Sequence, residues 1–279
     1  MIRDDELLRI LRDDCPHSDP TTEGLGIAGV PAHATLTARH DMVVCGVEEA
    51  ARMFELSGAS ARIVVGSGSQ AAAGTLLLEA AGSGGSLHRT YKMAQTLMEM
   101  LSGIATAAHV LVAAARQANP ACRVACTRKH MPGMKQWALR AIETGGAVPH
   151  RLGLSDYVLV FEEHRSLLDP SVPLADQFRR LKDHVPERKL AAEASDIDGA
   201  LLLARAGADI VQVDKLPPAD VAVVAGHLAQ MVPRPILAAA GGINASNAAA
   251  YAAAGADILV TSSPYLAPPR DVKVRIMPA

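Results

Sequence analysis

The spacing of hydrophobic and polar residues changes along the chain and divides it into two parts. In the first part, helical spacing at 2–13 and strand alternation at 34–39 and 61–65 are the regular patterns. Turn signals separate them, at 19–22, 66–69 and 80–86. A long helical pattern then runs over about 90–118. We therefore predict an α+β domain for this part.

From Arg123 onward, apolar runs of strand length alternate with segments of helical spacing. The six runs lie at 123–127, 157–161, 189–193, 210–214, 236–240 and 258–262. This alternation predicts parallel strands joined by right-handed crossovers. The sequence A-G-A-D occurs at 206–209 and at 254–257, where its Gly would end a helix just before a strand. The two copies favour an α/β barrel, and a doubly wound open sheet remains the alternative because strand order cannot be read from a sequence.

Composition narrows the class of protein. The 279 residues are 49% hydrophobic and 20% charged, which is typical of a globular protein with a sizeable core. The 27 Lys and Arg against 29 Asp and Glu give a net charge of −2, so no overall field attracts nucleic acid or an acidic membrane. Aromatic residues make up only 3%, too few for the stacking platforms that bind single-stranded nucleic acid. We expect no nucleic-acid partner, and a local cluster must hold any anionic ligand.

The cysteines and the apolar segments indicate where the protein works. Cys15, Cys45, Cys122 and Cys126 are too few and too scattered for a disulfide framework, so we expect a cytoplasmic protein. No second Cys or His pair with zinc spacing accompanies the last two, so we assign them no metal role. The most apolar run, 104–115, is shorter than a membrane span and predicts a buried helix. We therefore expect no membrane partner.

The candidate chemistry lies where the predicted strands of the second part end. In an α/β barrel the active site forms at that edge. Polar or Gly residues stand there at Thr127-Arg128-Lys129, Phe161-Glu162-Glu163-His164, Glu193, Asp214-Lys215, Gly241-Gly242 and Ser262-Ser263, with His150-Arg151 in a loop. Four cationic or potentially cationic groups would converge on an anion: Arg128, Lys129, His150 and Arg151. Together they would attract a carboxylate or a phosphate.

Two carboxylates and a glycine pair complete this picture. Glu193 and Asp214, on adjacent predicted strands, could hold Mg²⁺, hydrogen-bond the hydroxyls of a sugar or stabilise a cationic transition state. The sequence A-G-G-I-N at 240–244 would open a helix, whose N–H groups and dipole favour a phosphate. A phosphorylated sugar is the ligand these features favour. The alternatives without a functional role are a solvated strand end at 127–129 and a simple turn at 241–242.

Motifs along nearly the whole chain resemble those of the quinolinate phosphoribosyltransferase family, also called nicotinate-nucleotide pyrophosphorylases. They are T-R-K at 127–129, H-R-L-G-L-S-D at 150–156, Glu193, V-D at 213–214, G-G-I at 241–243, D-P-T-T at 19–22, A-R-H-D-M-V-V-C-G at 38–46 and L-S-G-I-A-T at 101–106. The details P-Y at 264–265 and D-V-K-V-R near the end look most like the ModD-type pyrophosphorylases of molybdenum transport.

The resemblance implies an architecture and a reaction. It implies an α/β sandwich of residues 1–106 plus about 264–279, an open α/β barrel of residues 107–263, and a homodimer in which each site borrows a residue from its neighbour. The family transfers ribose 5-phosphate from phosphoribosyl pyrophosphate (PRPP), usually with Mg²⁺, to the ring nitrogen of quinolinate, with decarboxylation. This chain would then be a PRPP-dependent pentosyltransferase with an aromatic acceptor.

The resemblance also assigns roles by position. The acceptor would meet Thr127, Arg128, His150 and Arg151. The ribose and pyrophosphate would meet the catalytic group Lys129, Glu193 and Asp214, whose two carboxylates would hold the metal. The 5-phosphate would lie on Ala240, Gly241, Gly242 and Ser262.

Two positions depart from the family pattern. Lys92 replaces an Arg that reaches into the neighbouring subunit's site, and Phe161 replaces a Lys that contacts a second acceptor carboxylate. Losing a charged partner from a desolvated site costs about 2–5 kcal/mol, so we predict an acceptor other than quinolinate. The alternatives are a true quinolinate enzyme of NAD biosynthesis, a non-catalytic oxyanion-binding protein of molybdate homeostasis, and a Schiff-base aldolase that uses Lys129 or Lys215.

Overall fold

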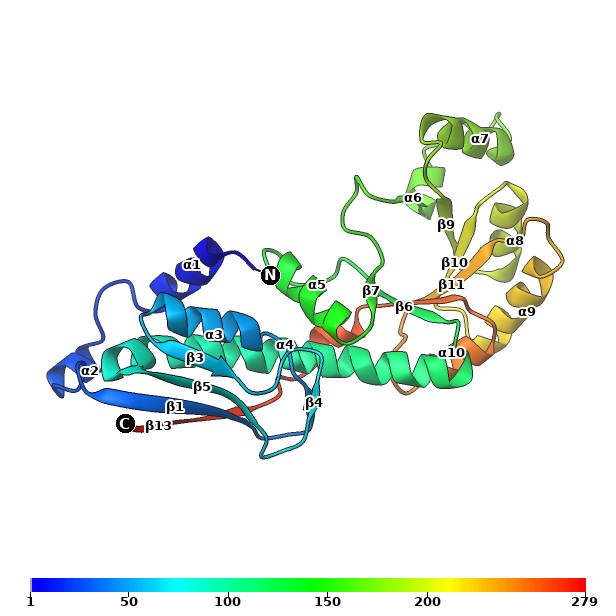
Figure 1. Cartoon of the computed structure of the whole chain (residues 1–279). Coiled ribbons are helices and arrows are strands. Elements are labelled where there is room, and N and C mark those ends of the chain that lie inside the picture. The colour runs from blue at the N-terminus through cyan, green and yellow to red at the C-terminus, as the bar shows by residue number, and fades with distance from the viewer. Residues whose placement is uncertain (1) are drawn as a thin grey trace. The chain divides into compact units, whose positions relative to one another are not determined.

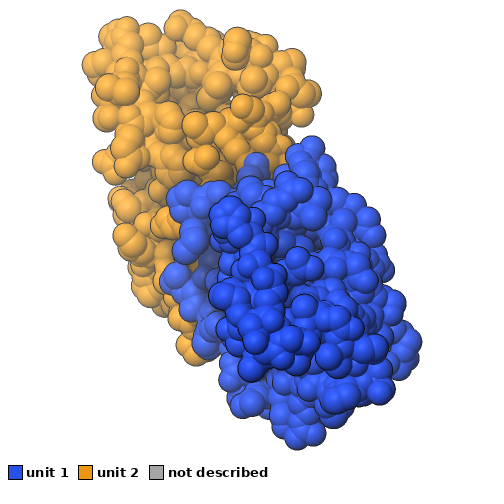
Figure 2. Space-filling model, turned by 90° about the vertical axis from the view of Figure 1, so that its left-hand side faces the viewer, with its two compact units in different colours: residues 1–109, 131–146, 265–279 blue, residues 110–130, 147–264 orange. Residues whose placement is uncertain are grey.

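The computed structural model describes residues 2–279, which form two compact units (Figures 1 and 2). Of the described residues, the first unit contains 2–109, 131–146 and 265–279, and the second contains 110–130 and 147–264. The sequence predicted one continuous barrel segment over 107–263, whereas residues 131–146 belong to the first unit. The reason is the apolar side of their helix, where Trp137 and Ala141 are buried in the first unit's core.

A four-stranded antiparallel sheet with the order β13-β1-β5-β3 forms the scaffold of the first unit. Its strands are β1 (Pro31–Ala38), β3 (Ser60–Ile63), β5 (Leu76–Ser83) and β13 (Val272–Pro278). Along β1, Ala34 and Leu36 are buried while His33 and Thr35 are partly exposed, as the alternation in the sequence requires. Because β13 pairs with β1, the last residues of the chain complete the sheet of its first part.

Helices cover one face of this sheet (Figure 1). The helices of the first unit are α1 (Asp4–Asp14), α2 (Pro20–Gly24), α3 (Val47–Leu56), α5 (Lys135–Thr144) and the first part of α4 (Gly84–Ala118), and a small ribbon pairs β2 (Met42–Val43) with β4 (Gln70–Ala71). Phe54 of α3 and Met98 of α4 are fully buried in the shared core. The turn predicted at 19–22 is the start of α2, which Asp19 caps by accepting from the amides of Thr21 and Thr22.

The long helix α4 begins earlier than its spacing predicts, at Gly84 rather than near Thr90. A Cβ added to Gly84 would lie 2.5 Å from the carbonyl oxygen of Ile27, so glycine here serves close packing rather than a turn. By length and composition alone α4 could cross a membrane, but 56% of its most apolar stretch is buried inside the protein. The core helix of a globular protein can have the same length and composition. The burial of this stretch agrees with the buried helix predicted over 104–115.

The second unit contains a sheet of seven parallel strands with the order β7-β6-β12-β11-β10-β9-β8. They are β6 (Arg123–Cys126), β7 (Val148–Pro149), β8 (Val158–Val160), β9 (Leu190–Ala194), β10 (Ile210–Asp214), β11 (Ile236–Ala240) and β12 (Ile258–Thr261). Neighbours follow chain order from β8 to β12, and β12 then pairs with β6. A doubly wound sheet would reverse at a switch point, so the strand order confirms the predicted barrel, open between β7 and β8.

Helices connect these strands, and the A-G-A-D repeat forms two equivalent corners. The helices are α6 (Glu162–Arg165), α7 (Leu174–His184), α8 (Ile197–Arg205), α9 (Pro218–Leu228) and α10 (Ala248–Ala253), with a short 3-10 turn η1 (Ser263–Leu266) after β12. Gly207 and Gly255 follow α8 and α10 with φ angles of 99° and 95°. Asp209 and Asp257 each accept a backbone N–H of the neighbouring strand at 2.7 Å. Both copies thus join a helix end to the start of a strand pair.

Candidate active site

The parallel sheet brings predicted site residues from all seven strands to its carboxyl edge. Gln212 of β10 lies opposite Glu193 of β9, and Asp214 lies opposite Ala240 of β11. Side chains alternate along a strand, so every second residue shares the face on which Leu159, Ile210 and Val260 form an apolar cluster. The last residues of that series are Thr127, His150, Phe161, Glu193, Asp214, Ala240 and Ser262. The structure therefore gathers these seven predicted residues on one rim.

Glu193 lies in an acidic part of this rim with a hydrogen-bond partner that the sequence analysis missed. The Gln212 Nε2 donates to Glu193 Oε2 at 2.6 Å. Burial raises the pKa of Glu193, the charge of Asp214 adds to this shift, and the hydrogen bond from Gln212 opposes it. A polar residue in the apolar run I-V-Q-V-D, two positions before Asp214, was the available signal for Gln212.

Arg165 is a second residue that sequence reasoning missed. Its Nη1 donates to the carbonyl oxygen of Glu193 at 2.7 Å, from the short helix α6 that follows β8. Its positive charge lowers the pKa of the Glu193 carboxyl, against the effect of burial. No spacing in the sequence links this residue to β9, because the contact forms between two separate strand ends. Arg165 therefore holds the end of β9 through the Glu193 carbonyl and partly offsets the negative charge of the Glu193 carboxylate.

The basic part of the rim differs in charge from the prediction. Arg128 and Lys129 are exposed in the loop after β6, where the Lys129 amide donates to Thr127 Oγ1 at 3.2 Å. Arg151 is partly buried, and burial together with the like charge of Arg128 lowers its pKa. His150 was counted among the potential cations, but burial lowers its pKa to about 4. It is neutral near pH 7, so the positive charge comes from the Arg and Lys side chains.

Aromatic contacts span the opening of the barrel. The Cζ of Arg151, which follows β7, lies 5.5 Å from the centre of the Phe161 ring, which follows β8. On the same side His150 meets the edge of Tyr157 at 5.5 Å between ring centres. His164 stacks on Phe161 at 5.8 Å and accepts its backbone N–H at 3.0 Å. Side chains, rather than strand pairing, therefore link β7 to β8.

The glycine pair lies on the rim but does not open a helix as predicted. Gly241 and Gly242 have φ angles of 87° and 72°, and α10 begins only at Ala248. The intervening turn satisfies its own amides, since Asn244 N donates to Asn247 Oδ1 at 2.8 Å. A Cβ on Gly241 would lie 2.6 Å from Asp214 Oδ1. Glycine here allows a close approach to β10, and a helix dipole does not act directly at the pair.

Lys92 belongs to the first unit, where it is exposed on α4 with Nζ 3.4 Å from Gln95 Oε1.

Across residues 2–279, no group of three or more His, Cys, Asp or Glu side chains is arranged to hold a metal ion. On the rim, Glu193 and Asp214 provide two carboxylates on the neighbouring strands β9 and β10. All four cysteines are free thiols.

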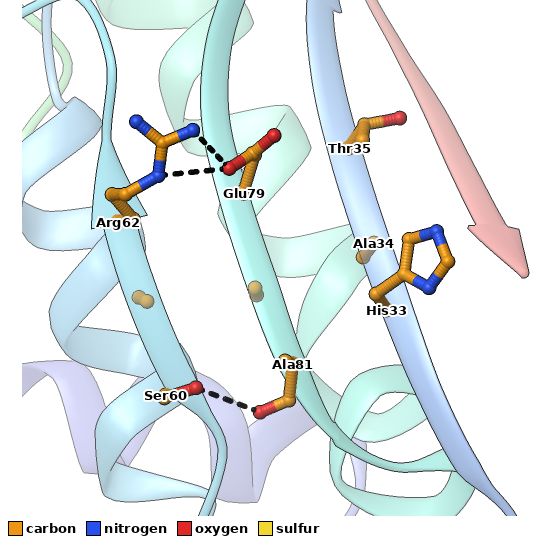
Figure 3. Close-up of a pocket in the computed structure, with 9 residues that line it drawn as sticks. His33, Ala34, Thr35, Ser60, Arg62, Glu79 and Ala81 are labelled. Atoms are coloured by element: carbon orange, nitrogen blue, oxygen red, sulfur yellow. Dashed lines mark hydrogen bonds and ion pairs between the residues drawn. The ribbon is translucent and has the colours of Figure 1, made fainter. Parts of the chain in front are cut away.

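A shallow pocket on the first unit's sheet contains none of the predicted residues. It lies on the face away from the helices and is lined by residues of β1, β3 and β5. Arg62 and Glu79 form an ion pair across β3 and β5, and Ser60 Oγ donates to the Ala81 carbonyl at 3.2 Å (Figure 3). The polar groups of each pair bind one another, so these two pairs leave no free polar group for a ligand in the pocket.

Comparison with known proteins agrees with this geometry. Family models described as "Quinolinate phosphoribosyl transferase", N-terminal domain and C-terminal domain, match residues 19–102 and 104–275. A Rhodobacter capsulatus protein with the provisional name pyrophosphorylase ModD is 46% identical over 249 residues, 89% of this chain and 95% of that one. A Methanothermobacter thermautotrophicus protein named "Probable nicotinate-nucleotide pyrophosphorylase (carboxylating)" is 30% identical over 91% of both chains.

The fold also has close counterparts among solved structures. NadC from Streptococcus pyogenes superposes with a TM-score of 0.89 over 99% of this chain and 96% of that one, at 23% identity. The nicotinate-nucleotide pyrophosphorylase from Francisella tularensis gives 0.88 over 99% and 98%, at 22% identity. These likenesses support the fold, while the family models and the 46% identical relative support the family. The chain belongs to the quinolinate phosphoribosyl transferase family.

Proposed function

We propose that the protein transfers the ribose 5-phosphate group of PRPP to a ring nitrogen of an aromatic acceptor that carries less negative charge than quinolinate. Family membership supports the transfer itself. The contact between Arg151 and Phe161 supports the change of acceptor. A dicarboxylate would meet an apolar ring at Phe161, whereas a flat, less charged heterocycle would lie against the same ring at little cost.

The acidic part of the rim would serve the donor. During transfer, the bond between ribose C1 and the pyrophosphate oxygen breaks, and pyrophosphate leaves with the electron pair. Positive charge then develops at C1 and the ring oxygen, and ionised Glu193 and Asp214 would stabilise it. Gln212 favours the ionised form of Glu193 through its hydrogen bond. The lone pair of the acceptor nitrogen forms the new bond to C1, and Lys129 would bind the departing pyrophosphate.

Glu193 and Asp214 are suited to Mg²⁺ that arrives with the donor. Mg²⁺ commonly binds one or two carboxylates and takes its other ligands from substrate phosphates and water. Two carboxylates without a third protein ligand among the described residues fit that pattern better than a permanent metal centre. When bound, Mg²⁺ would neutralise charge on the pyrophosphate group.

The basic part of the rim would hold the acceptor. Arg128 and Arg151 repel each other, as the lowered pKa of Arg151 reflects, so an anionic group between them would be favourable. Neutral His150 would donate or accept one hydrogen bond without adding charge. Two guanidinium groups suit one carboxylate held between them, and the apolar ring of Phe161 offers no cation for a second. We therefore favour a monocarboxylic or uncharged nitrogen heterocycle.

The test is release of pyrophosphate from PRPP and Mg²⁺ with quinolinate, with aromatic monocarboxylic acids and with azoles. We expect turnover with a less charged ring and little with quinolinate. Phe161→Lys should raise kcat/KM for quinolinate by roughly tenfold or more. Phe161→Leu, which removes the ring without adding a cation, is the matched control. Ordinary rates with quinolinate in the wild-type protein would contradict the changed acceptor and favour the quinolinate enzyme.

A non-catalytic oxyanion-binding role makes the opposite prediction. Glu193 and Asp214 would repel a bare oxyanion such as molybdate, and they suit a sugar phosphate with Mg²⁺. Calorimetry should therefore give useful affinity for PRPP with Mg²⁺ and poor affinity for molybdate. Tight binding of molybdate without binding of PRPP would contradict the transferase function. Failure to trap a borohydride adduct would remove the Schiff-base alternative.

We also propose a homodimer with shared sites in the cytoplasm. Exposed Lys92 on α4 supports sharing, since its ammonium makes a long 3.4 Å contact with Gln95 Oε1. Four free thiols support a reducing compartment. Lys92→Met and Glu193→Gln should each be inactive, and an equal mixture that exchanges subunits should regain about a quarter of the wild-type activity, because half of the dimers then have one intact site. No recovery despite exchange would contradict a shared site.

A further inference from the structure

The strand β10 ends in a backbone conformation that is unusual for its residue. Lys215 has a φ of 60°, and it is the one non-glycine residue with a positive φ in the part of the chain that the structure describes. Side chains with a Cβ adopt this region at a cost, and such strain gathers at functional sites. Its amide donates to the Ala240 carbonyl at 2.8 Å, and the next residue, Leu216, is buried. These contacts hold Lys215 in the strained conformation.

The side chain of Lys215 passes against the first glycine of the pair, Gly241. A Cβ added to Gly241 would lie 2.5 Å from Lys215 Cγ, so the aliphatic stem passes directly against Gly241. The side chain is 79% exposed, and its ammonium lies 3.6 Å from Asp214 Oδ2. An exposed pair at this distance contributes little to stability, so the ammonium can exchange its partner easily. Lys215 therefore presents a cation beside the glycine pair.

The other side of Lys215 does not suit an anion. A depression there is lined by Lys215 together with Asp196, Asp198 and Asp220. Three carboxylates would repel a phosphate placed in that depression. Beside Gly241, by contrast, lies the single carboxylate of Asp214, which already pairs with Lys215 at 3.6 Å. An anion that pairs with Lys215 would therefore lie on the side of Gly241.

We propose that Lys215 binds the phosphate monoester of the ribose 5-phosphate group beside Gly241, and that it exchanges Asp214 for this phosphate when the donor binds. The inference rests on the proposed function and adds a residue to it. It explains how the glycine pair could hold a dianion although α10 begins only at Ala248 and supplies no helix dipole at the pair. The exchange would also free Asp214 from its ion pair with Lys215 when the donor binds.

Calorimetry with two probes, ribose 5-phosphate and pyrophosphate, tests the proposal. Lys215→Met should weaken binding of ribose 5-phosphate roughly 10- to 100-fold, the usual effect of losing a charged hydrogen bond, and change pyrophosphate binding less than about twofold. Lys215→Arg should retain most of the affinity. Lys215→Gly should bind as weakly as Lys215→Met but unfold at higher temperature, because glycine relieves the strain. Lys189 is an exposed lysine just before β9, at the amino end of the sheet. As a control, Lys189→Met should bind both probes like the wild type.

The outcomes separate the two proposals. Wild-type affinity for ribose 5-phosphate in Lys215→Met, or an equal loss for both probes, would overturn the role of Lys215 and leave the transferase function standing. Binding of neither PRPP nor ribose 5-phosphate by the wild-type protein would overturn both. Selective loss for ribose 5-phosphate in Lys215→Met and Lys215→Gly, with binding retained in Lys215→Arg, supports the assignment.

Discussion

Gln212 of β10 donates to the carboxylate of Glu193 on the neighbouring strand β9 at 2.6 Å. This bond opposes the rise in the pKa of Glu193 that burial causes. Replacing Gln212 with Leu should therefore raise that pKa further. In the pH profile of kcat/KM, the loss of activity on the acid side should move to higher pH by about one unit.

Gln230→Leu is the matched control, because Gln230 is exposed after α9. Its profile should coincide with that of the wild-type protein. An unchanged acid side in Gln212→Leu would mean that Glu193 does not titrate in the rate-limiting form of the enzyme.

Glu193 should reduce the stability of the protein while it supports activity. Its pKa is raised in the folded state, so folding disfavours the ionised form above the ordinary pKa of a glutamate. Glu193→Gln should abolish transfer and stabilise the protein at pH 7 by about 1 kcal/mol, the usual size of such a trade-off. The gain should shrink as the pH falls through the folded-state pKa, because Glu193 is then protonated as well. Urea unfolding at pH 7 and pH 4 checks both points, and a gain that is independent of pH would contradict the ionisation argument.

His150 should make the protein sensitive to moderate acid. Its folded pKa of about 4 lies below the ordinary value of 6.5, so the unfolded chain binds a proton more readily between these values. The stability that neutral His150 provides is complete above pH 6.5 and is lost as the pH falls towards 4, at up to about 1.4 kcal/mol per pH unit. His150→Gln should flatten this part of the stability curve. NMR titration of the imidazole gives the direct measurement, and a pKa near 6.5 would contradict the burial argument.

An ion cluster in the first unit should be far more important for stability than a surface pair. Arg140 of α5 contacts Glu49 and Glu48 of α3, each at 2.9 Å, and Glu49 is completely buried. Arg140→Met should leave that carboxylate uncompensated and destabilise the protein by about 3 kcal/mol. Arg52→Met, which removes exposed pairs with Asp4 and Glu55, should cost less than about 1 kcal/mol. Urea unfolding should separate the two variants clearly, and equal losses would contradict the importance of burial.

Sequence periodicity predicted the strand series of the second part because strand and helix spacing are local properties, while in the first part it missed α3, β5 and β13. All six predicted runs of the second part became strands, and the A-G-A-D corners formed twice. The strand at Val148–Pro149 was missed because two residues cannot show alternation. The start of α4 was missed because Gly84 reads as a turn signal, although it is needed for close packing against Ile27.

The site was predicted as a set of strand ends, and its contacts and charges were not. Thr127, Glu193 and Asp214 could be placed on one rim because parallel strands share a carboxyl edge. The neutral state of His150 depends on burial, and the link from Arg165 to β9 depends on which loops meet. Both are properties of the folded chain that spacing does not record.

Residues at the opening of the barrel should tolerate substitution better than residues at the centre of its sheet. Arg151 and Phe161, which we propose to meet the acceptor, follow the edge strands β7 and β8, each of which has a neighbour on one side only. Glu193, Asp214 and Ala240 end strands that are paired on both sides. Substitutions around the opening can therefore reshape the proposed acceptor site without breaking a strand pairing, while the proposed donor site is fixed by the centre of the sheet. Such a scaffold can acquire a new acceptor while it keeps its donor.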